Sequence, residues 1–147
     1  MSPRPHSSLR EGVILGGVVG SGIWVWIALV DVVVGEPLRT FAVLGGVARF
    51  TTLHFVFCLA YGVVAVSVVH AAAREASLMV GAAFAFFLLE FAFVMLTAIL
   101  SQGSLGGLAW ARVLGGNAVG AALTILILWR RHPLAQEFRD GTAEGEE

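Results

Sequence analysis

Four ionisable side chains lie inside stretches that are otherwise almost wholly apolar: Asp31, His54, Glu90 and Arg112. Ionisable groups are expensive within lipid, so they usually face a bundle interior, where they pair, bind a ligand or relay protons. Asn117 joins this set because its amide can donate to and accept from a buried carboxyl group. These residues are the candidates for chemistry in the chain.

The residue types do not form a catalytic set of the kind found in soluble enzymes. The sequence has one cysteine, Cys58, and therefore no paired thiols. It also lacks an H-E-x-x-H motif, a P-loop and a nucleophile elbow. We therefore expect no enzymatic activity and no metal site.

Composition places these candidates in a membrane protein. Of the 147 residues, 58% are hydrophobic and 13% are charged, and the mean hydropathy is +0.88. Such values exclude a disordered chain, which needs low hydrophobicity and high charge. The net charge of -1 gives no electrostatic reason to expect a nucleic-acid partner. The lipid bilayer is the expected surrounding.

Four apolar stretches are long enough to cross a bilayer, which requires roughly 20 residues in a helix. They cover residues 13–34, 51–72, 77–100 and 109–129. The segments between them are short, so helices adjacent in sequence should pack antiparallel. We expect an all-α polytopic membrane protein, with residues 1–147 forming one four-helix antiparallel bundle. Segment 35–50 is expected to lie flat at the outer interface, with a shallow re-entrant segment as the alternative.

Arginine distribution predicts the orientation, because cytoplasmic segments near the spans carry an excess of positive residues. Four spans put both termini on one side, as tails 1–10 and 133–147. That side holds six arginines and the other three: Arg4, Arg10, Arg74, Arg130, Arg131 and Arg139 against Arg39, Arg49 and Arg112. Both termini are therefore expected in the cytoplasm.

Glycines at four-residue spacing predict close helix packing, because small residues let backbones approach in lipid. The first span carries Gly12, Gly16 and Gly20, and the last carries Gly116 and Gly120. The simplest interpretation is a tight contact between the first and last spans. A dimer face built on one of these grooves is the alternative.

Depth along the helices, at about 1.5 Å per residue, separates the polar candidates into two layers. Asp31, His54 and Arg112 form an outer layer, with Arg49 nearby. They are expected either to fix helix ends as an ion-pair network or to bind a small polar ligand. Glu90 and Asn117 form a central layer. There, Glu90 either donates as a neutral acid to Asn117 or serves as a proton-coupling or cation-binding carboxylate.

His54 also suggests a cofactor. His54 and His70 are near opposite ends of one span, as in two-haem membrane helices, but no second span offers matching histidines. A single tetrapyrrole ligated by His54 is the remaining version of this idea, and otherwise no cofactor is expected.

A longer pattern of residues carries a resemblance. It runs through Leu9-Arg-Glu-Gly-Val-Ile14, Trp24 to Trp26, Asp31, Gly35-Glu-Pro37, Thr40, Leu44-Gly45, Thr52-x-His54 and His132-Pro-Leu134. In these residues the chain resembles a group of uncharacterised bacterial four-span membrane proteins. The resemblance implies the same span count and location in the bacterial inner membrane, and it brings no activity or cofactor.

Three functional hypotheses follow. The first is a non-enzymatic accessory or scaffold subunit of a larger membrane complex, such as an energy-converting one, with other membrane subunits as partners. The second is a small self-associating transporter or channel that uses Glu90, with Asn117 and Arg112 nearby. The third is a tetrapyrrole- or quinone-binding protein that uses His54.

Overall fold

The computed structural model describes residues 8–72, 80, 81, 87, 88, 91, 95, 99 and 109–131. The elements in these residues are α1 (Ser8–Val33), α2 (Arg39–Val43), α3 (Val47–Ala72) and α5 (Ala109–Arg131). Three of these helices are long and apolar enough to cross a membrane, over Leu9–Val33, Val47–Ala71 and Ala111–Arg131. This confirms the predicted all-α class, with three candidate membrane-spanning helices among the described residues. Most of the predicted span 77–100, including Glu90, lies outside the described residues.

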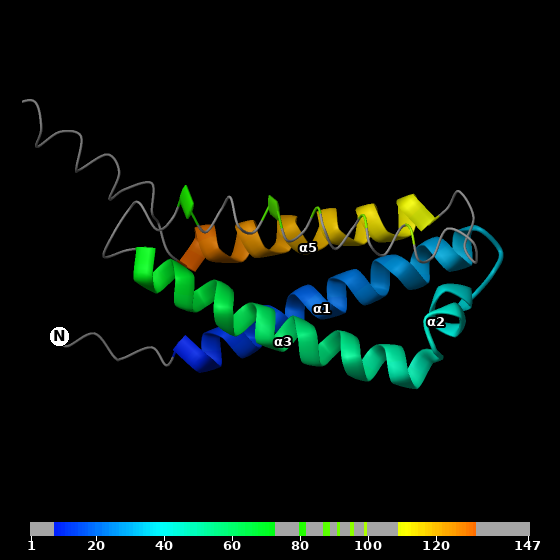
Figure 1. The fold of residues 1–147 in the computed structure, drawn as a ribbon, viewed down its shortest axis with the longest axis horizontal. Coiled ribbons are helices and arrows are strands. Elements are labelled where there is room, and N and C mark those ends of the chain that lie inside the picture. The colour runs from blue at the N-terminus through cyan, green and yellow to red at the C-terminus, as the bar shows by residue number, and fades with distance from the viewer. Residues whose placement is uncertain are drawn as a thin grey trace, which may run out of the picture.

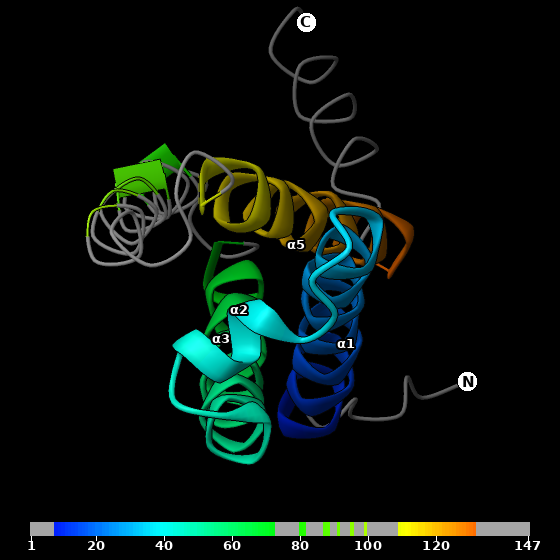
Figure 2. The ribbon, with the colours of Figure 1, turned by 90° about the vertical axis from the view of Figure 1, so that its right-hand side faces the viewer.

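Helix α1 lies at the centre of the described arrangement. Both α3 and α5 pack against it and run in the opposite direction (Figure 1). The short helix α2 lies at the end where α1 finishes and α3 begins (Figures 1 and 2). The buried apolar side chains Leu15, Val19 and Val66 form a small core where α1 and α3 meet, and side chains of α5 pack against it as well. Because α1 and α5 pack antiparallel, the end of α1 lies beside the start of α5, and ionisable groups at this end can meet.

The contact between α1 and α3 brings the two backbones together. A Cβ atom built on Gly12 would lie 2.5 Å from the Cα of Val63, and one on Gly16 would overlap the carbonyl oxygen of Cys58. On the facing helix, a Cβ on Gly62 would overlap the backbone of Gly12 and Gly16. From Gly12 to Gly16 the contact moves towards the C-terminus of α1, and on α3 it moves towards the N-terminus, from Val63 to Cys58. The two helices are therefore antiparallel.

The predicted contact between the first and last spans is present, although the glycines of the two spans do not face one another. Gly12 and Gly16 face α3, whereas Gly116 and Gly120 of α5 lie against the side chain of Ile23. The α1–α5 contact does exist, but it places α1 side chains in α5 glycine grooves. Four-residue spacing specifies that glycines share a face, and it carries no information about which helix covers that face.

The connection between α1 and α3 is shaped by backbone of positive φ. Gly35 (φ 81°), Gly45 (φ 103°) and Gly46 (φ 95°) adopt it at no steric penalty, and Leu38 (φ 63°) adopts it as well. The chain therefore folds back after α1, and α2 packs against both α1 and α3. Segment 35–50 was expected to be flat or re-entrant; it contains α2 and the start of α3.

Replacing Gly16 with alanine should destabilise the fold, because the new methyl group would meet backbone that cannot move alone. We expect a loss of roughly 1–3 kcal/mol, typical of overpacked sites. Gly17→Ala is the matched control, since nothing lies within 4 Å of the position its Cβ would occupy. The free energy of unfolding in mild detergent measures both variants, and equal values would contradict the backbone contact.

Candidate functional site

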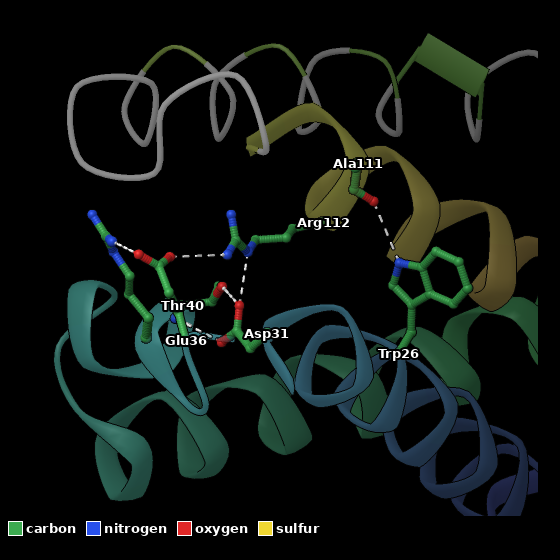
Figure 3. A network of polar contacts seen from close by, with 7 residues as sticks. Trp26, Asp31, Glu36, Thr40, Ala111 and Arg112 are labelled. Atoms are coloured by element: carbon green, nitrogen blue, oxygen red, sulfur yellow. Dashed lines mark hydrogen bonds and ion pairs between the residues drawn. The ribbon is translucent and has the colours of Figure 1, made fainter. Parts of the chain in front are cut away.

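Three side chains from three helices form a buried polar cluster, here called the Asp31 cluster: Asp31, Thr40 and Arg112 (Figure 3). Arg112 Nε, on α5, donates to Asp31 Oδ1 at 2.7 Å. The Thr40 hydroxyl, on α2, donates to the same oxygen at 2.6 Å, and the Thr40 amide donates to Oδ2 at 2.8 Å. One carboxylate therefore joins α1, α2 and α5.

Burial makes these contacts necessary. The exposed fraction is 0% for Asp31 and 1% for both Thr40 and Arg112. A buried charge is tolerated when an opposite charge and hydrogen bonds replace its lost water. Asp31 has both, because the guanidinium neutralises it and three donors reach its two oxygens. The Asp31 cluster therefore holds the end of α1 to α2 and to the start of α5.

Glu36 extends the cluster towards the surface. Its Oε2 lies 3.7 Å from Arg112 Nη2, and its other oxygen pairs with the exposed Arg39. Arg112 Nη2 is buried and makes no hydrogen bond within the described part of the chain. Two carboxylates thus alternate with two guanidinium groups, so the extended cluster is formally neutral.

The local sequence explains how Thr40 reaches Asp31. The Glu36 amide donates to the Asp31 carbonyl at 2.9 Å, which closes the turn after α1. The left-handed backbone at Leu38 then starts α2 in the reverse direction. Amides in the first turn of a helix have no partner within it, and Asp31 supplies an acceptor for that of Thr40. Sequence reasoning missed Thr40 and Glu36; their position around the Gly35-Glu-Pro37 turn was the available signal.

A second contact between α1 and α5 lies beside the cluster. Trp26 Nε1 is 3.4 Å from the carbonyl oxygen of Ala111 (Figure 3). The indole reaches this position because Gly115 has no side chain: a Cβ there would lie 2.5 Å from Trp26 Nε1. The same end of α5 is therefore held by an ion pair and by an aromatic ring against its backbone.

A run of aromatic rings connects the cluster to His54. Phe41, which follows Thr40 and is fully buried, has its ring centroid 4.9 Å from that of Trp24 and 5.2 Å from that of Phe50. Phe50 in turn stacks on His54 at 5.3 Å. The Trp24 indole also donates to the Thr51 hydroxyl at 3.0 Å. These aromatic contacts pack Phe41 of α2 against both α1 and α3.

His54 lies deeper than the outer layer in which we expected it. Its Nε2 is 2.9 Å from the carbonyl oxygen of Gly20, which precedes Asp31 by eleven residues, or about 16 Å along α1. The reason is that α3 begins at Val47 rather than at residue 51. Asp31 and Arg112 do meet as predicted, but His54 makes no hydrogen bond to either. Arg49, also expected nearby, is exposed.

The geometry at His54 bears on the cofactor hypothesis. Its Nε2 faces the Gly20 carbonyl, and the Cys58 sulfur lies 3.7 Å from the same nitrogen and 3.9 Å from Nδ1. Ligation of a tetrapyrrole would require the ring to leave these contacts. Among the described residues, no group of three or more histidine, cysteine, aspartate or glutamate side chains could hold a metal ion.

The predicted central layer is visible only in part. Glu90 lies outside the described residues, and Asn117 Nδ2 is buried without a hydrogen-bond partner among those that are described. Nearby on α5, the Thr124 hydroxyl accepts from Tyr61 at 3.2 Å and donates to the Gly120 carbonyl at 2.8 Å. The bond from Tyr61 to Thr124 therefore joins α3 to α5 directly.

No protein-family model, curated protein or solved structure matches the chain. The geometry of the Asp31 cluster and of the helix faces around it is therefore the basis for assigning a function.

Thr40→Val should destabilise the protein by about 1–3 kcal/mol, because it removes a donor to a buried carboxylate with little change of shape. The Thr40 amide would remain on Asp31, so we expect a folded variant with a lower unfolding midpoint. The exposed Thr52 gives the control Thr52→Val. If both variants unfold at the wild-type midpoint, the Thr40 hydroxyl contributes nothing to stability and does not help to hold the helix ends together.

Proposed function

We propose that this chain is a non-catalytic integral membrane protein that acts as an accessory or scaffold subunit of a larger membrane assembly. The observation that carries the proposal is the buried ion pair between Asp31 and Arg112. Each charge is directed at the other, and Thr40 takes further lone pairs of the carboxylate. Ionisable groups held in this way fix the relative position of helices.

The surfaces of the helices support the same proposal. Large apolar side chains face outward along α3, with exposed fractions of 70% for Phe57, 57% for Val56 and 49% for Leu53. Lipid or the apolar helices of neighbouring subunits can cover such a face. A bundle with fixed helix ends presents it in one geometry, which is what a scaffold requires.

A transporter that uses Glu90 is the second candidate, and one observation favours it. The buried amide nitrogen of Asn117 has no hydrogen-bond partner within the described residues. A carboxyl group of the kind predicted at Glu90 would satisfy it, either as a structural partner or as a proton-coupling group.

The two candidates differ in the mass of the native particle. If the chain is a subunit, gentle extraction from its own membranes should give a particle much heavier than a small multiple of 15.5 kDa, containing unrelated chains. Native mass spectrometry with identification of the copurified proteins measures this directly. A particle made only of this chain would contradict the subunit proposal and would favour the transporter.

A further inference from the structure

Basic side chains gather at the end of the bundle opposite α2. There α1 begins and both α3 and α5 end (Figure 1). Arg10 of α1 and both Arg130 and Arg131 of α5 are exposed, and His70 in the last turn of α3 is partly exposed. These four residues are called the basic end.

The acidic residue described in this region does not neutralise the outer surface. Glu11 is only 9% exposed, and its two oxygens are directed at two residues of the basic end. Oε2 lies 4.0 Å from His70 Nε2, and Oε1 lies 3.8 Å from Arg131 Nη1. Arg10 and Arg130 make no ion pair with any residue in the described ranges. Within these ranges, no acidic side chain neutralises either arginine.

Exposed apolar side chains lie next to these arginines on α1 and α5. Leu9 is 64% exposed and Val13 44% exposed on α1, while Trp129 is 65% and Leu126 48% exposed on α5. A tryptophan at this position is typical of the boundary between hydrocarbon and headgroups. A ligand that fits both parts has an anionic head and apolar tails.

We propose that the basic end binds the phosphate headgroup of an anionic phospholipid, with the acyl chains lying along α1 and α5. Arginines near a membrane surface attract anionic lipid, and basic sites between transmembrane helices bind such headgroups. Free phosphate would use the arginines alone, whereas a phospholipid also covers the apolar surface beside Trp129. The inference goes beyond the proposed function and holds whether the chain is a subunit or a transporter.

The test compares two arginines that differ only in their place in the fold. Arg130 belongs to the basic end, and Arg49 is an exposed arginine at the α2 end; neither forms an ion pair within the described part of the chain. The full chain, purified in mild detergent, is titrated with phosphatidylglycerol and with phosphatidylcholine. Retained lipid is counted by native mass spectrometry.

We expect phosphatidylglycerol to bind more tightly than phosphatidylcholine to the wild-type chain. Arg130→Gln should weaken phosphatidylglycerol about five-fold, the effect of one arginine near a surface, and Arg10→Gln combined with it should weaken it further. Arg49→Gln should leave binding unchanged. The unfolding midpoint without added lipid identifies any variant that fails to fold, in which case Arg10→Gln alone replaces it.

Three results would overturn the inference. Equal binding of the two lipids would remove the role of headgroup charge. Equal losses from Arg130→Gln and Arg49→Gln would remove the role of the basic end. Displacement of phosphatidylglycerol by millimolar inorganic phosphate would show a phosphate site without acyl-chain contacts.

Discussion

The buried ion pair between Asp31 and Arg112 is the interaction on which the described arrangement depends most. It joins residues 81 positions apart in the chain and holds the start of α5 against the end of α1. Removing one partner would leave an uncompensated charge in a site that is almost wholly buried, which in proteins costs about 3–5 kcal/mol.

The pair acts together with two different kinds of helix contact on α1. Towards α3, Gly12 and Gly16 allow backbone to touch backbone. Towards α5, side chains such as Ile23 enter grooves at Gly116 and Gly120. Apolar packing in lipid depends on such shape complementarity, because no water is released to drive helices together. The ion pair then fixes the register between α1 and α5. Apolar packing alone would specify that register less strongly.

A looser acid–arginine pair lies at the other end of the same two helices. Glu11 and Arg131 are 3.8 Å apart, and the arginine is 46% exposed. Acidic residues near both ends of α1 thus face arginines near both ends of α5. The tight, buried pair at the α2 end defines the geometry, and the longer pair at the basic end joins a buried carboxylate to a partly exposed arginine.

Sequence reasoning predicted the apolar spans and the meeting of Asp31 with Arg112, because hydrophobic length and the expense of buried charge are local properties. It did not predict Thr40, whose hydroxyl reaches Asp31 only after a left-handed turn at Leu38. It also placed His54 too near the surface, since α3 extends beyond its apolar core to Val47. Helix partners depend on tertiary packing, so the glycine pattern predicted the contact between the first and last spans, which is present, but not the backbone contact of Gly12 and Gly16 with α3.

The most direct test of this account is a double-mutant cycle on the central pair, with Asp31→Asn, Arg112→Gln and the combination. The free energy of unfolding in mild detergent is measured for all four proteins. Each single variant should be strongly destabilised, and the double variant should lose less than the sum by at least about 1 kcal/mol, as residues in contact do. Strictly additive losses would contradict the claim that these two charges hold the helices together.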